Sequence, residues 1–154
     1  MESTLENPAP AVVESARGAV RIAYWIVTAL FCLEMSFTAY YELLPQGAQA
    51  FARLGFSSGD FRLELSLAKL TGVVVLLAPM LPPRLKEWAY AGFAINLVSA
   101  FLAHLSIGDS RLAFVPSMLT GVLWAISYYF WHHLEAVVQN GNVSVQAGKR
   151  ARGL

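Results

Sequence analysis

The chain has 154 residues, which is enough for one domain. Hydrophobic residues make up 56% of it and charged residues only 14%, whereas soluble domains carry about 25% charged residues. So few charges cannot cover a water-facing surface, and the composition therefore predicts a membrane protein. The formal net charge of +1 excludes a strongly basic nucleic-acid-binding protein, so no nucleic acid is expected among the partners.

The N-terminal segment is acidic and contains prolines. A secretory signal would instead open with basic residues and continue at once into an apolar core. We therefore predict that residues 1–18 form a disordered cytoplasmic segment. At the other end, residues 135–154 contain Gly, Asn and Gln and finish with basic residues, which predicts a polar, solvated tail.

Four segments between these ends are long and apolar enough to be transmembrane helices, which need about 20 residues each. They lie at about 20–43, 63–81, 87–106 and 112–131. Pro82 and Pro83 cannot continue a helix and end the second segment, and none of the four has the large polar face that a soluble helix bundle requires. The sequence thus predicts an all-α fold, an integral membrane four-helix bundle over residues 19–134.

The lone cysteine, Cys32, lies inside the first apolar segment. One cysteine excludes an intramolecular disulfide and a CxxC motif for redox exchange or metal binding. We interpret Cys32 as a buried structural thiol.

The distribution of Lys and Arg predicts the orientation, because cytoplasmic loops retain positive charge. One side of the predicted bundle carries Arg17, Arg21, Arg84, Lys86, Lys149, Arg150 and Arg152. The other side carries Arg53, Arg62 and Arg111. This asymmetry predicts that both termini are cytoplasmic, and we expect a multi-pass protein of a bacterial inner membrane.

The longest connection, residues 45–62, lies on the external side in this topology. Its apolar residues Ala48, Phe51, Ala52 and Phe56 are close to helical spacing. We expect either a short amphipathic helix lying on the outer membrane face or a simple surface loop.

Ionisable residues within the predicted spans each need a reason, because a charge at membrane depth costs at least about 2.5–3.5 kcal/mol on insertion scales. These residues are Glu34, Glu42, Glu64, Lys69 and His104, accompanied by the amide of Asn96. Most of them fall in the outer half of the bundle. We therefore predict a polar pocket there, with Glu34, Lys69 and His104 as catalytic candidates and Asn96, Tyr41 and Glu64 as ligand-binding candidates.

Structural roles for the same residues stay open. Glu34 and Lys69 are expected at similar depth, so they could form an ion pair that only fixes helix register. Lys69 could instead extend towards the outer interface, and His104 could cap its helix. Asn96 could be an interhelical hydrogen-bond donor, and Tyr41 an interfacial aromatic residue, although rings that line a cavity would suit a quinone.

Small residues in the second and third spans predict close helix contact. They are Ala68, Gly72, Ala89, Gly92 and Ala100.

Standard soluble-enzyme motifs such as GxGxxG, the Walker loop, HExxH and GxSxG are missing. His132 and His133 do not share a helical face and have no facing histidine, which argues against a bis-histidine haem, and no metal site is expected.

Several segments together resemble a known family. They are the Leu-Gly-Phe segment at 54–56, Lys69 with Gly72, the run from Leu85 to Phe93, the segment from His104 to Asp109, and the pair Ser127-Tyr128. Over about residues 21–131 the chain resembles the DoxX-like family of small four-helix membrane proteins. The resemblance implies an accessory subunit in quinone-linked or oxidative-stress redox metabolism, with a soluble or membrane redox partner near Arg84 to Trp88. The cofactor stays open, with quinone as the candidate.

Three classes of function therefore remain open. The first is the accessory redox subunit that the resemblance implies. The second is a stand-alone membrane enzyme, such as an isomerase, that acts on a hydrophobic small molecule, with Glu34 and His104 as acid and base and Lys69 as a stabilising charge. The third is a non-catalytic scaffold or a transporter, for which a homo-oligomer is one arrangement.

Overall fold

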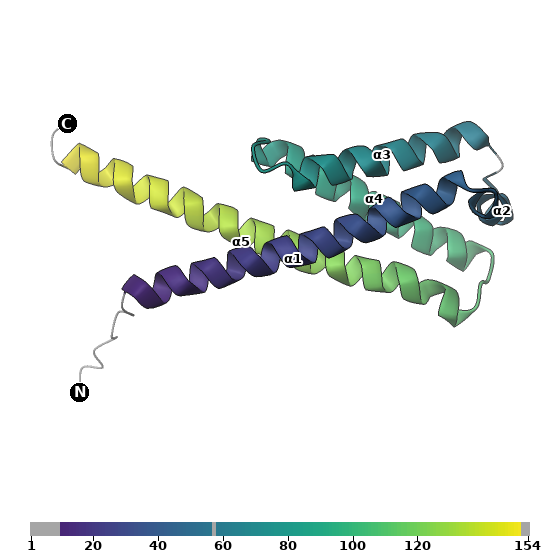
Figure 1. Cartoon of the computed structure of the whole chain (residues 1–154), viewed down its shortest axis with the longest axis horizontal. Helices are drawn as coiled ribbons and strands as arrows, with labels where there is room; N and C mark the ends of the chain where they lie inside the picture. The colour runs from purple at the N-terminus through teal and green to yellow at the C-terminus, as the bar shows by residue number, and fades with distance from the viewer. Residues whose placement is uncertain (1–9, 57, 152–154) are drawn as a thin grey trace. The chain divides into compact units, whose positions relative to one another are not determined.

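The computed structural model describes residues 10–56 and 58–151. Within these ranges the chain contains five α-helices and one short 3-10 helix, and no strand (Figure 1). They are α1 Pro10–Leu43, α2 Pro45–Arg53, α3 Gly59–Leu77, α4 Pro83–Ser106, η1 Arg111–Phe114 and α5 Val115–Ala151. The predicted all-α fold is confirmed, and α1, α3, α4 and α5 overlap the four predicted apolar segments.

The ends of these helices differ from the predicted ones. α1 begins at Pro10 and not near residue 20, because proline at the first position of a helix costs nothing and presets its backbone angle. α5 continues to Ala151, through residues predicted as a tail, since residues 132–151 contain no proline to stop it. α3 ends at Leu77 because Ala78 precedes Pro79 and adopts an extended conformation.

The connection between α1 and α3 contains the helix α2, so a short helix is present there and not a simple loop; its location on the outer membrane face stays a prediction. Proline at its start again favours the helix, and α2 packs against α3. The turn from α1 into α2 depends on Gly47. A Cβ atom at Gly47 would lie 2.3 Å from the carbonyl oxygen of Tyr41 and 2.8 Å from the Cα of Glu42, both backbone atoms.

Residues 27–128 form one compact unit, and the remaining described residues form a second. In the second unit, aromatic neighbours pack locally. The rings of Tyr24 and Trp25 meet edge-on at 5.1 Å, and those of Trp131 and His132 at 5.3 Å. All of the contacts discussed below lie within the first unit.

α3 and α4 run side by side in the first unit and pack directly on each other (Figure 1). A Cβ atom at Gly72 would lie 2.8 Å from two ring atoms of Phe93. The ring of Phe93 in turn packs edge-on against Phe31 of α1, with ring centres 5.0 Å apart. The close helix approach predicted from Gly72 is therefore confirmed, and Phe93 is the side chain that uses the space.

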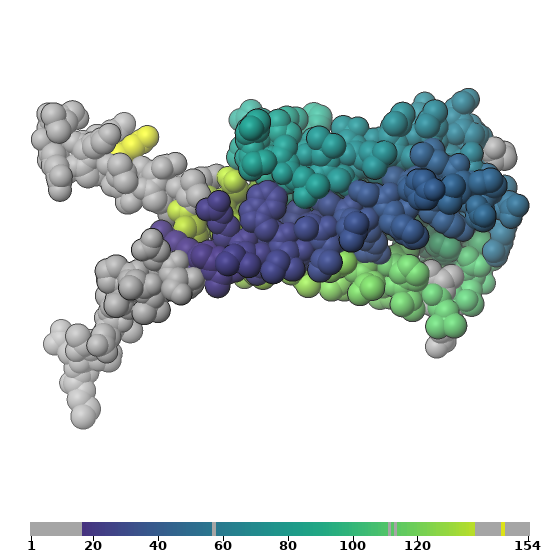
Figure 2. All heavy atoms as spheres, in the orientation of Figure 1, coloured from purple at the N-terminus to yellow at the C-terminus, as the bar shows by residue number. Residues whose placement is uncertain are grey.

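Large apolar side chains point outward from every long helix in the first unit, while several polar ones are buried. Leu33 of α1 is 68% exposed and Ile95 of α4 is 69% exposed. Among the residues of this unit whose burial the structure describes, the buried polar ones are Thr28, Glu42, Ser66, Lys69, Lys86, Thr120 and Ser127. In the space-filling view the side chains of α1 and α3 meet on the face shown (Figure 2). A small apolar core that includes Phe31, Leu76 and Phe93 is also buried, but so many exposed large apolar side chains are unusual for a water-soluble protein.

Among the described residues, two segments are long and apolar enough to cross a membrane by length and composition alone. They are Arg17–Leu43 in α1 and Pro83–Ser106, which is the whole of α4. α3 is not one of these two segments because it carries more charge, with Asp60, Arg62 and Glu64 in its first two turns and Lys69 further along.

Candidate functional site

A buried ion pair joins the end of α1 to the middle of α3. The ammonium group of Lys69 donates a hydrogen bond to Oε1 of Glu42, and the hydroxyl of Ser66 donates to Oε2 at 3.0 Å. Glu42 is 6% exposed and Lys69 is 7% exposed. Each carboxylate oxygen therefore has a donor, which reduces the cost of burying both charges.

Of the alternatives left open for Lys69, the ion pair with Glu34 is not formed, because its partner is Glu42. Side chains on an α-helix point towards its N-terminus. The ammonium of Lys69 therefore lies nearer the start of α3, which follows α2 and faces the end of α1 that carries Glu42.

Glu34 has a different partner, on α5. Its carboxylate accepts a hydrogen bond from the hydroxyl of Thr120, and that hydroxyl also lies 2.8 Å from the carbonyl oxygen of Pro116. Thr120 is buried and Glu34 is partly buried. The contact links α1 to α5.

His104 belongs to a third cluster, at the end of α4. Its Nδ1 lies 2.7 Å from Oδ2 of Asp109, and Nη2 of Arg53, on α2, lies 3.4 Å from Oδ1 of the same carboxylate. Gly108, with a φ of +67°, makes the turn that brings Asp109 back to His104. Asp109, in the turn between α4 and η1, therefore links His104 at the end of α4 to Arg53 on α2.

The three predicted catalytic residues thus have three different sets of partners, and the contacts of the described residues do not bring them into one site. Tyr41 and Glu64, predicted as ligand-binding residues, are exposed. Asn96 does share a site with Lys69, because both line the same groove. In residues 10–56 and 58–151, no three His, Cys, Asp or Glu side chains are arranged to hold a metal ion.

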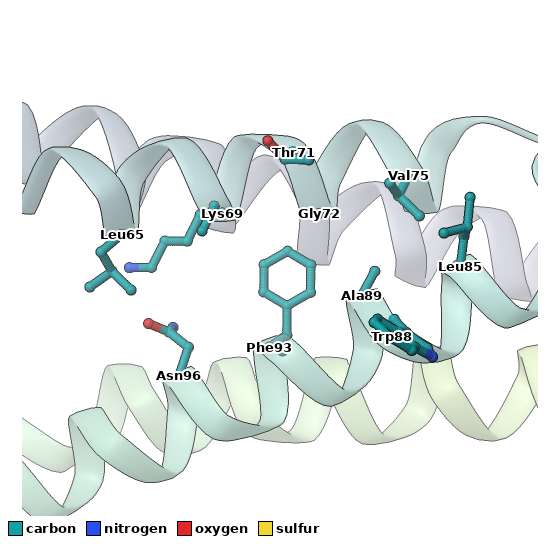
Figure 3. A pocket seen from close by; sticks show the side chains of 12 residues that line it. Leu65, Lys69, Thr71, Gly72, Val75, Leu85, Trp88, Ala89, Phe93 and Asn96 are labelled. Atoms are coloured by element: carbon teal, nitrogen blue, oxygen red, sulfur yellow. The ribbon is translucent and has the colours of Figure 1, made fainter. Parts of the chain in front are cut away.

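The groove lies between α3 and α4 and has a volume of about 390 Å³, within the usual range of about 300–1,000 Å³ for ligand pockets. Its lining is mostly apolar: Leu65, Ala68, Lys69, Thr71, Gly72, Val75, Leu85, Trp88, Ala89, Gly92, Phe93 and Asn96. Lys69 and Asn96 point towards each other at one end, Leu85 and Trp88 lie at the other, and Phe93 is between them (Figure 3). The groove therefore has a polar end and an apolar end.

Comparison with known protein families matches residues 26–126 to the DoxX-like family. The match covers well over half of the 154 residues. The chain belongs to the DoxX-like family. No curated protein and no solved structure matches it.

The match to the DoxX-like family includes the ion pair of Lys69 and Glu42, the whole groove and the cluster around His104. Together with the exposed apolar side chains and the two long apolar helices, it identifies the chain as an all-α DoxX-like membrane protein. The resemblance stated from the sequence is confirmed.

A buried chain of hydroxyl groups in this DoxX-like protein escaped the sequence analysis. The hydroxyl of Ser127 on α5 lies 2.7 Å from that of Thr28 on α1 and 2.7 Å from that of Tyr90 on α4. The indole N–H of Trp124 donates to the carbonyl oxygen of Tyr90 at 3.0 Å. Small hydroxyl residues inside apolar helices were the available signal, since such residues form interhelical hydrogen bonds in membranes.

Proposed function

We propose that this DoxX-like protein crosses the membrane four times, with both termini in the cytoplasm of a bacterium. Exposed apolar residues on α3 and α5 support two spans beyond α1 and α4. On α3 they are spaced three or four residues apart: Leu63, Leu67, Leu70, Val74 and Leu77. Lys69, the charge furthest into α3, is buried and paired, so it does not face lipid.

Single-cysteine variants test this topology. In a Cys32→Ser background, Ser58→Cys and Ser110→Cys should react with a membrane-impermeant maleimide in intact cells, because both positions belong to the external connections. Arg84→Cys should react only after the cells are opened. The opposite pattern would reverse the orientation, and labelling of all three in intact cells would exclude the four-span topology.

We further propose that the protein binds a lipid-soluble molecule with a polar head in the groove between α3 and α4. The observation that carries this proposal is the groove itself, with apolar walls and the donors of Lys69 and Asn96 at one end. An ammonium group has three N–H donors and an amide has two, so these two side chains can hydrogen-bond an oxygen-rich head. A quinone is the candidate that the family resemblance favours, because its ring is flat and its carbonyl oxygens are acceptors.

The same resemblance supports an accessory role in quinone-linked or oxidative-stress redox metabolism. In that role α4 would present its exposed start to a redox partner, with Arg84 and Trp88, the latter 79% exposed, as the contact residues. A second copy of the chain is the alternative partner. Copurification with tagged protein tests this role, and loss of the partner in Arg84→Glu would support it.

The geometry supports binding over the isomerase alternative. Acid–base catalysis needs the acid and the base within hydrogen-bond reach of one substrate, whereas Glu34 and His104 are held by Thr120 and Asp109 respectively. The scaffold alternative remains as the outcome in which the groove takes no ligand.

Native mass spectrometry of the protein purified in a mild detergent tests the binding proposal. We expect a retained lipid-soluble molecule, or uptake of an added short-chain benzoquinone. Asn96→Leu should reduce occupancy, whereas Ile95→Ala, which faces away from the groove on the same helix, should not. A wild-type protein that retains nothing and takes up nothing would contradict the proposal.

A further inference from the structure

The charge state of the groove's polar end determines which head groups fit there. Lys69 is the only charged residue among the described residues that line the groove. Its charge is already balanced, because the Glu42 carboxylate accepts a hydrogen bond from its ammonium group. Glu42 does not itself line the groove.

We propose that the groove selects ligands with a neutral, oxygen-bearing head group over ligands with an anionic one, and that Glu42 is the specificity-determining residue; this inference rests on the proposed binding function. A neutral oxygen can accept hydrogen bonds from Lys69 and Asn96 and leaves the balanced pair unchanged. An anionic head would bring a second negative charge to a cation that Glu42 already neutralises. One charge would then be left without compensation in a region of low dielectric, which is costly.

Two features hold Glu42 in this position. The hydroxyl of Ser66 donates to its second carboxylate oxygen at 3.0 Å. The backbone of Gly47 also packs against the backbone of Glu42 so closely that even a Cβ atom would collide. Glu42 is therefore fixed by contacts that no ligand in the groove needs to make.

Removal of the charge on Glu42 should therefore change the selectivity. In Glu42→Gln, Lys69 would keep its positive charge without a counter-ion, and an anionic ligand would then supply the missing charge. Ser66→Ala is the matched control, because it removes a hydrogen bond to Glu42 and leaves both charges in place.

The test uses two photoreactive probes that differ in charge and little in shape, a long-chain alkyl sulfonate and the corresponding alkyl methyl sulfone. Labelling of α3 and α4 peptides is measured in detergent and normalised to labelling of the exposed face of α5. In the wild type we expect the sulfone to bind at least about tenfold more tightly, because the sulfonate leaves a buried charge uncompensated. In Glu42→Gln this preference should be lost or reversed, and Ser66→Ala should retain it.

Equal binding of the two probes by the wild type would overturn the inference, and so would an unchanged preference in a folded Glu42→Gln. If Glu42→Gln does not fold, Lys69→Gln replaces it and should exclude the sulfonate more strongly than the wild type does, since Glu42 then stands alone. A Lys69→Gln variant that binds the sulfonate better than the wild type does would overturn the inference. A wild-type groove that binds neither probe would instead contradict the proposed binding function.

Discussion

Lys69 and Glu42 form a buried ion pair although they belong to different helices and lie 27 positions apart in the sequence. Ser66, one helical turn before Lys69, donates to the same carboxylate. Both side chains of this pair are less than a tenth exposed, unlike those of the Arg53–Asp109 and His104–Asp109 pairs. Its loss should therefore be costly.

Removal of one member of the pair should destabilise the protein more than removal of both. We expect Lys69→Met or Glu42→Gln alone to cost about 3–5 kcal/mol, because a buried charge is left without its partner. The double variant should recover most of that loss. Thermal unfolding in detergent measures the cycle. As a control, Arg53→Gln breaks the partly exposed pair with Asp109 and should cost less than about 1 kcal/mol. If Arg53→Gln costs as much stability as Lys69→Met, the loss in Lys69→Met does not come from burial of the pair.

Gly72→Ala should destabilise the contact between α3 and α4. The added methyl group would lie 2.8 Å from the ring of Phe93, which is buried and packed against Phe31 and so has little room to move. We expect a loss of about 1–3 kcal/mol. Gly92→Ala on the facing helix is the matched control, because no atom lies within 4 Å of its added Cβ. It should be neutral or stabilising, and equal losses at both positions would contradict this explanation.

Ser127→Ala should destabilise the protein by about 1–3 kcal/mol. The substitution removes the hydroxyl of Ser127, so the buried hydroxyl of Thr28 loses its hydrogen-bond partner. Adding Thr28→Val should restore part of the stability, since the unsatisfied hydroxyl then disappears. Thr71→Val provides the comparison: its hydroxyl is exposed and bonds only within its own helix, to the carbonyl of Leu67. Chemical unfolding in detergent would decide between a specific network and a general effect of losing hydroxyls.

Gly47→Ala should be the most damaging of the single-methyl substitutions. The added Cβ would collide with backbone atoms of Tyr41 and Glu42, and a backbone cannot swing aside as a side chain can, so we expect a loss of about 3 kcal/mol. Gly59→Ala, with open space at the start of α3, should have little effect. A Gly47→Ala protein as stable as Gly59→Ala would show that α1 and α2 can separate freely.

Patterns in the sequence predicted the parts of the structure that depend on periodicity and residue size. Apolar spacing predicted the long helices and α2, and Gly72 predicted the close approach of α3 and α4. The end of α3 was misplaced because Pro79, which lies before Pro82, already prevents the helix from continuing.

The site was predicted less well, because partner choice depends on side-chain direction and helix rotation. Lys69 and Asn96 were both singled out as polar residues within apolar helices, and the structure places them in one groove. Glu34 and His104 were singled out by the same argument and are bound elsewhere. Residue depth alone does not determine the direction in which a helix presents its side chains. The hydrogen bond between Tyr90 and Ser127 likewise depends on how α4 and α5 pack in space, which the sequence does not give.

The ion pair between α1 and α3 also constrains how the protein is made. Lys69 emerges from the ribosome after Glu42, and in the four-span topology proposed above each residue alone would enter the bilayer as an uncompensated charge at a cost of about 2.5–3.5 kcal/mol. The two charges neutralise each other only when both helices are present. The biosynthetic consequence is that α1, α2 and α3 are favoured to insert together as a helical hairpin, and not one helix at a time.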